Sequence, residues 1–80
     1  NQEAAWYAGA IGEPAGWLAL ATRRPAVMVT GSDLAALSAA HPQDLVMVGR
    51  THCIDGDPYR SYAFETPADV VARPPAVGNC

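Results

Sequence analysis

The stretch LVMVGRTHCIDGDPYRSYAF, residues 45–64, decides the fold. Leu45–Ile54 is the longest strand candidate in the chain, and Asp55-Gly56 is a pair that type I′ turns favour, because both central positions of that turn have positive φ. Tyr59–Phe64 then returns as the second strand, and Pro58 marks it as an edge strand because proline has no N–H for a ladder bond. The segment therefore predicts a β-hairpin.

A two-residue turn fixes which residues of the two strands lie opposite one another. The expected pairs are Ile54 with Asp57, His52 with Tyr59, Arg50 with Ser61, Gly49 with Tyr62, and Met47 with Phe64. Since side chains alternate between the faces of a strand, Met47, Phe64 and Tyr62 share one face, which we expect to pack in the core.

The opposite face of the hairpin carries polar side chains and one aromatic ring on a rigid support. We expect Arg50, His52, Tyr59 and Ser61 to form a binding patch there, together with Val48 nearer the hairpin base. The alternative is an ordinary solvated sheet face with an amphipathic tyrosine, because alternation alone produces such groupings.

One helix is predicted before this hairpin in the sequence and another after it. The first spans Asp33–Ala40, with Ser32 as its N-cap, and ends at His41-Pro42, because proline cannot continue a helix. The second runs from a Thr66 N-cap to Arg73, with Pro67 at its first position and Asp69 in its first turn. Residues 74–80 are expected to form a flexible tail.

The first third of the chain predicts a helix followed by another hairpin. Asn1–Ala8 contains good helix formers, while Trp17–Thr22 and Ala26–Thr30 are short apolar runs joined by Arg23-Arg24-Pro25. We expect Trp17 in the core. The whole is one α+β domain of 80 residues in the order α-β-β-α-β-β-α, with a small antiparallel or mixed sheet of two hairpins and one covering helix.

Three segments resemble a short prokaryotic domain family of unknown function, over about residues 6–49. They are Ala15–Leu20, Val27–Leu34 and Asp44–Val48. The resemblance implies a helix, two strands, a leucine-rich helix and a final aliphatic strand, but no activity. The abundance of alanine and the absence of lysine are typical of a GC-rich genome.

Composition excludes several classes of protein. The formal net charge is -3 and the arginines are scattered, which disfavours nucleic acid as a partner. With 50% hydrophobic residues the chain can build a core, yet no apolar run approaches the ~20 residues that cross a bilayer. We therefore expect a soluble acidic domain without membrane or nucleic-acid partners, and the cytoplasm is favoured over secretion.

The cysteines and the residues around Cys53 admit few chemical roles. Cys53 and Cys80 are compatible with one disulfide or with two free thiols. His52 and Cys53 are neighbours in a strand and point to opposite faces, so they form no nucleophilic pair. Asp55-Gly56-Asp57 fits a turn better than a calcium loop, because no ladder of further oxygen ligands follows. No cofactor and no metal are expected.

These observations favour a non-enzymatic module for protein–protein interaction or self-association, since exposed strand edges accept another strand. The alternative is a small secreted inhibitor or ligand-binding protein stapled by a disulfide between Cys53 and Cys80. A third hypothesis, an enzyme that uses His52, Cys53 and Asp55 in hydrolysis or redox work, needs a cleft for which short loops leave little room.

Overall fold

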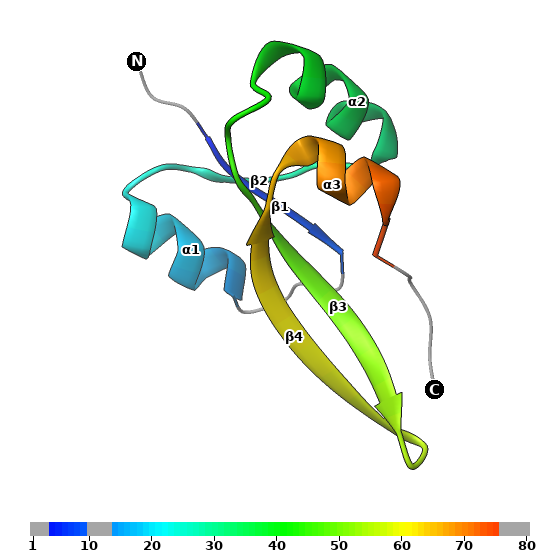
Figure 1. Cartoon of the computed structure of the whole chain (residues 1–80). Coiled ribbons are helices and arrows are strands. Elements are labelled where there is room, and N and C mark those ends of the chain that lie inside the picture. The colour runs from blue at the N-terminus through cyan, green and yellow to red at the C-terminus, as the bar shows by residue number, and fades with distance from the viewer. Residues whose placement is uncertain (1–3, 10–13, 76–80) are drawn as a thin grey trace.

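The structure is a computed structural model that describes residues 4–9 and 14–75. Within these residues the elements are β1 (Ala5–Gly9), α1 (Pro14–Thr22), β2 (Ala26–Met28), α2 (Gly31–Ala40), β3 (Val46–Ile54), β4 (Asp57–Glu65) and α3 (Pro67–Ala72). The strands form one sheet in the order β2-β1-β3-β4, in which β1 is parallel to both neighbours and β4 is antiparallel to β3 (Figure 1). The predicted α+β class with a mixed sheet is confirmed.

The hairpin of β3 and β4 has the predicted turn and register. Asp55 and Gly56 both have positive φ, 53° and 82°, as a two-residue type I′ loop requires. All five expected cross-strand pairs are present, from Ile54 opposite Asp57 to Met47 opposite Phe64. The turn residues alone therefore determined the pairing of the longest strands in the molecule.

The predicted first hairpin is wrong. Trp17–Thr22 belongs to α1, and the part of the expected N-terminal helix that the structure describes is strand β1. Residues 18–21 are leucine and alanine, which favour helix, and Thr22 at the end is the one β-branched residue of the run. Parallel strands such as β1 and β2 need a crossover connection, which α1 supplies, so Arg23-Arg24-Pro25 joins a helix to a strand.

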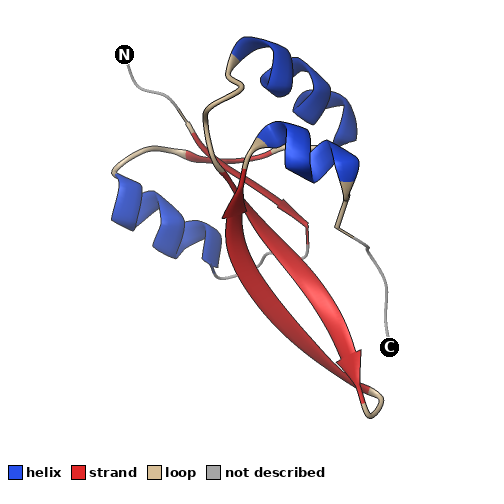
Figure 2. Ribbon diagram, in the orientation of Figure 1, coloured by secondary structure: helices blue, strands red, loops and turns tan. Residues whose placement is uncertain are grey.

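Helices cover both faces of the sheet rather than one (Figure 2). On one face α2 and α3 bury Ala8, Val29, Leu34, Leu37, Val46, Val48 and Val70, with Trp6 packed against them. On the other face, Leu18 of α1 packs with Ala5 and Met47. The expected burial of Leu34 and Leu37 is confirmed.

The cap of α2 corrects one residue of the prediction. Thr30 is the N-cap and Ser32 lies inside the first turn. The Asp33 carboxylate accepts hydrogen bonds from the Thr30 N–H (2.9 Å) and the Thr30 hydroxyl (2.8 Å). An acid three residues after a threonine has the spacing of a capping box, which explains why Thr30 takes the role predicted for Ser32.

The cap of α3 is as predicted. The Asp69 N–H donates to the Thr66 hydroxyl at 3.3 Å, and Pro67 stands at the first helical position. The helix ends at Ala72, and Arg73 is its C-cap. Of the predicted tail, residues 76–80 lie outside the described residues, while Pro75 is half-buried near Gly9.

Gly9 ends β1 at a point where only glycine fits. Its φ is +90°, a region that other residues rarely adopt, and it pairs with Gly49 of β3. A Cβ atom built on Gly9 would overlap the Gly49 carbonyl oxygen and lie 3.1 Å from Cβ of Pro75. The backbones of β1 and β3 can therefore stay paired at this end only without a side chain on Gly9.

Gly9→Ala is expected to destabilise the fold by about 2–3 kcal/mol, because both the steric overlap and the positive φ oppose a methyl group. Gly16→Ala is the matched control, since Gly16 lies within α1, where a Cβ would meet nothing within 4 Å. That change is expected to be neutral or to stabilise by up to about 1 kcal/mol. Urea unfolding of both variants checks this, and equal midpoints would contradict the steric argument.

Asp33→Asn is expected to lower stability in a pH-dependent way. The backbone and side-chain hydrogen bonds from Thr30 hold the pKa of Asp33 below its usual value, so the charged carboxylate is favoured in the folded state. This stabilisation is present above the unfolded-state pKa and is lost as the pH falls through the lower folded-state pKa. Unfolding midpoints of the two proteins should therefore converge in acid, and a pH-independent difference would refute the assignment.

Candidate interaction surface on the β3–β4 hairpin

The hairpin extends beyond the core as an arm (Figure 1). The first four residues of β3, Val46–Gly49, are buried, whereas every residue from His52 to Phe64 is exposed. The outer part of the arm therefore has solvent on both faces, and a two-stranded ribbon of this kind is only marginally stable by itself in water. Its surfaces are the first place to look for contacts with another molecule.

The predicted patch lies together on one face of this arm. The register sets Arg50 opposite Ser61 and His52 opposite Tyr59. His52 Nε2 and Ser61 Oγ are 2.8 Å apart in an exposed hydrogen bond, and Tyr59 is 53% exposed. Geometry thus supports the grouping of the four residues, while their role in binding stays a prediction.

Arg50 is engaged in an ion pair that sequence reasoning missed. Its guanidinium donates to the Glu65 carboxylate at 2.8 and 3.3 Å, and both side chains are largely shielded, with 14% and 16% exposed. Arg73, the C-cap of α3, lies 3.8 Å from the same carboxylate. Ala63 lies between Ser61 and Glu65 on this face, so Arg50 can reach past its small side chain. An acid two residues after a small residue on the same face of the strand was the signal in the sequence that could have indicated this ion pair.

The His52–Ser61 pair is the closest approach to catalytic geometry in the arm. A histidine bonded to a serine hydroxyl can act as its general base, but the base normally needs a third group on its other ring nitrogen. Among the described residues no carboxylate contacts Nδ1 of His52, and the pair lies exposed on a sheet face outside the pocket found in the described chain. The arrangement favours a polar contact surface over hydrolysis.

The face expected to pack in the core is only partly buried. Met47 is 2% exposed, as predicted, but Tyr62 and Phe64 are 42% and 52% exposed. The helix on this side, α1, packs on β1 and β2, and it also leaves Trp17 exposed, contrary to the expectation that Trp17 lies in the core. Leu20, one turn further along α1, is 82% exposed. The α1 side of the molecule thus exposes apolar side chains from both α1 and β4.

In the part of the chain that the structure describes, no strand lies beside the outer edge of β4. In a hairpin with a two-residue loop, the two residues that flank the loop form backbone hydrogen bonds with each other. The next residue on each strand points its N–H and C=O away from the partner strand, and the two orientations alternate from there on. Counting from Asp57, the outward groups belong to Pro58, Arg60, Tyr62 and Phe64. Pro58 has no N–H, but its position faces away from β3, so no hydrogen bond between β3 and β4 is lost there.

Several other features bear on function. The possible disulfide between Cys53 and Cys80 lies outside the described residues, because Cys80 is not among them. No group of three or more His, Cys, Asp or Glu side chains in residues 4–9 and 14–75 is placed to hold a metal ion. Over the same residues, no helix has the length and apolar character needed to span a membrane.

Comparison with known proteins adds no relative, since no family model, no curated protein and no solved structure matches this chain. The resemblance of residues 6–49 to a prokaryotic domain family accordingly stays a prediction. Inferences about function rest on the geometry of the chain itself.

Removing either partner of the Arg50–Glu65 pair is expected to cost about 1–3 kcal/mol of folding stability, because a shielded charge then loses its hydrogen bonds. Glu65→Gln should destabilise more than Asp57→Asn, an exposed acid at the hairpin tip. The double variant Arg50→Met with Glu65→Leu should recover part of the loss, since neither charge remains. Thermal unfolding of these variants, with Arg50→Met and Glu65→Leu also made singly, checks this, and independent, additive effects would contradict coupling.

Proposed function

We propose that the chain is a non-enzymatic self-association module whose β4 edge pairs with β4 of a second copy. The observation that carries the proposal is the open outer edge of a nine-residue strand next to exposed aromatic side chains. Unpaired N–H and C=O groups along an edge accept another strand readily. The other edge strand, β2, has three residues and offers much less backbone to a partner.

One antiparallel register fits two copies of β4 best. Two identical strands related by a two-fold axis pair symmetrically about one residue, and bonds form only between residues whose backbone groups point outward. Centring the pair on Tyr62 sets Tyr62 opposite its own copy and Arg60 opposite Phe64. This register forms about six backbone hydrogen bonds, and it ends where Pro58 has no N–H to give.

Side chains support the same register. Arg60, Tyr62 and Phe64 share the α1 side of the sheet, because they alternate along one strand. The pairing sets each Arg60 guanidinium against the Phe64 ring of the other copy, which favours a cation–π contact, and it brings the two Tyr62 rings together. No like charges face each other across the joint. The edge is therefore complementary to itself in both hydrogen bonding and charge.

Near its tip, β4 carries features that prevent pairing along its whole length. Asp57 and Pro58 lie at the outer end of the strand, beyond Arg60, Tyr62 and Phe64. Prolines and charges are common devices against indiscriminate strand addition. Pairing is thus confined to the stretch from Arg60 to Phe64, which favours a closed dimer over an extended fibre.

Tyr62→Pro is expected to weaken dimerisation by roughly tenfold to a hundredfold, because it removes the central outward N–H from both copies without removing a bond to β3. The matched control is Tyr62→Ala, which loses the same ring but keeps the N–H and should retain more of the affinity. Tyr59→Ala, on the other face, should leave dimerisation unchanged. Sedimentation velocity over a dilution series measures all three.

Amide hydrogen exchange gives a second readout that does not depend on how well the proline variant folds. The Tyr62 and Phe64 amides of the unaltered chain should gain protection as the protein concentration rises, while the Asp57 amide should not change. A strict monomer at about 1 mM, or an equal effect of Tyr62→Pro and Tyr62→Ala in folded proteins, would overturn the proposal.

A further inference from the structure

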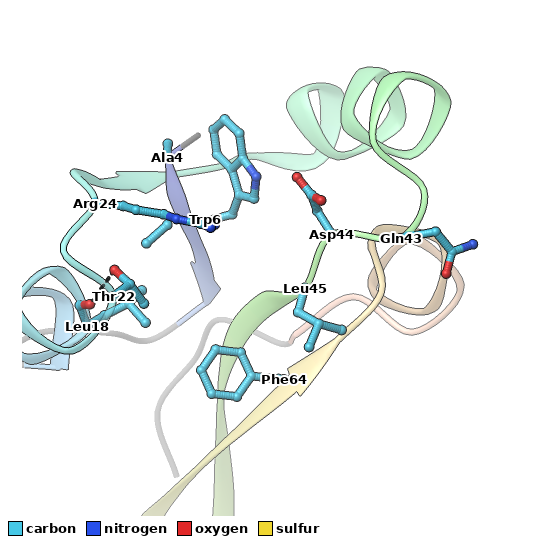
Figure 3. A pocket seen from close by; sticks show the side chains of 10 residues that line it. Ala4, Trp6, Leu18, Thr22, Arg24, Gln43, Asp44, Leu45 and Phe64 are labelled. Atoms are coloured by element: carbon cyan, nitrogen blue, oxygen red, sulfur yellow. Dashed lines mark hydrogen bonds between the residues drawn. The ribbon is translucent and has the colours of Figure 1, made fainter. Parts of the chain in front are cut away.

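A pocket of about 340 Å³ opens at the amino-terminal ends of β1 and β3, and Phe64 of β4 also borders it (Figure 3). Trp6 of β1 and Leu18 of α1 line it on one side, and Leu45 and Phe64 line it on the other. The two parallel strands pair only from Trp6 and Val46 onward, so the residues before them diverge and leave this space. Its volume falls at the small end of the range for small-molecule sites.

The walls of the pocket are apolar and incompletely covered. Leu18 is 1% exposed, whereas Leu45 and Phe64, which flank the opening, are each 52% exposed. The Trp6 indole is half-buried, and its Nε1 is covered from solvent without a hydrogen-bond partner among the described residues. Exposed apolar side chains around a pocket favour an occupant with an apolar group. The unsatisfied indole N–H favours an occupant that also carries a hydrogen-bond acceptor.

Two opposite charges reach the pocket from opposite walls. In Figure 3 the Arg24 guanidinium extends from the α1 side, and the Asp44 carboxylate faces it across the gap beside the Trp6 ring. The two side chains form no ion pair with each other, and Arg24 has no partner among the described residues. Nδ1 of His41 lies 3.7 Å from the Asp44 carboxylate. A ligand that carries both charges could pair with both walls at once.

We propose that this pocket binds a free α-amino acid with an apolar side chain. The carboxylate of the amino acid pairs with Arg24 in the bidentate geometry that a guanidinium favours, and its ammonium pairs with Asp44. The apolar side chain lies between Leu45, Phe64 and the Trp6 ring. A carboxylate without an ammonium would leave Asp44 facing an anion, and an amine without a carboxylate would leave Arg24 facing a cation, so the zwitterion fits better than either.

Three ligands that differ by one group test this assignment. L-phenylalanine carries both charges, 3-phenylpropionate lacks the ammonium, and phenethylamine lacks the carboxylate. The chain has two tryptophans, and Trp17 is exposed, so in a Trp17→Phe background the emission of Trp6 alone reports occupancy. L-phenylalanine is expected to give a saturable change and to bind at least about tenfold more tightly than either analogue.

Charge variants then assign each group of the ligand to a residue. Arg24→Gln should weaken L-phenylalanine at least about tenfold and leave the binding of phenethylamine unchanged or tighter, whereas Asp44→Asn should weaken L-phenylalanine and leave the binding of 3-phenylpropionate unchanged or tighter. Arg23→Gln is the matched control, because Arg23 is the neighbouring exposed arginine and does not line the pocket. It should have no effect.

Several results would overturn the proposal. They are the absence of a saturable change up to about 10 mM L-phenylalanine, equal affinities for the three ligands, and equal effects of Arg23→Gln and Arg24→Gln. Phe64 belongs both to the pocket and to the proposed dimer contact, whereas Tyr62 does not line the pocket. The titration is therefore repeated in Tyr62→Pro, which weakens self-association without altering the pocket lining, and binding should persist in that variant.

Discussion

The burial of β3 on both faces is the constraint on which the rest of the fold depends. Val46, Met47 and Val48 are at most 2% exposed, with Met47 directed to the α1 side and the two valines to the α2 and α3 side. A strand with no face in solvent needs a helical layer above and below it and a partner strand along each edge. The sheet order with β1 and β4 on either side of β3, and the crossover helices that parallel strands require, follow from that need.

The sequence predicts well those features that depend on neighbouring residues. Asp55-Gly56 specifies its turn through backbone conformation alone. The two-residue turn then fixes the register of β3 and β4. Thr66-Pro67 specifies the start of α3 in the same local way. The grouping of Arg50, His52, Tyr59 and Ser61 on one face required only this register, so the arrangement of the predicted patch could be derived before any tertiary contact was known.

Features that depend on distant residues could not be derived in this way. Ala5–Gly9 is a strand because β2 and β3 pair with both of its edges, and nothing within the segment itself indicates those partners. The ion pair of Arg50 with Glu65 joins residues that are not directly opposite one another in the hairpin. It engages the Arg50 guanidinium, whose charge sequence reasoning had assigned to the binding patch. The pocket combines residues from separate segments between Ala4 and Phe64, so Arg24 and Asp44 carried no shared signal in the sequence.

The hairpin arm is longer than the core requires, and this length has a physical consequence. Residues beyond Gly49 in β3, and those of β4 before Glu65, add little buried apolar surface, yet their ordering costs conformational entropy. Within the described residues, the turn at Asp55-Gly56 and the ion pair between Arg50 and Glu65 hold the ribbon at its two ends. Neither contact requires the intervening aromatic residues to face solvent. The proposed addition of a second strand to β4 accounts for the exposure of Tyr62 and Phe64, because the same pairing supplies backbone hydrogen bonds and apolar contacts that the described residues do not give this edge.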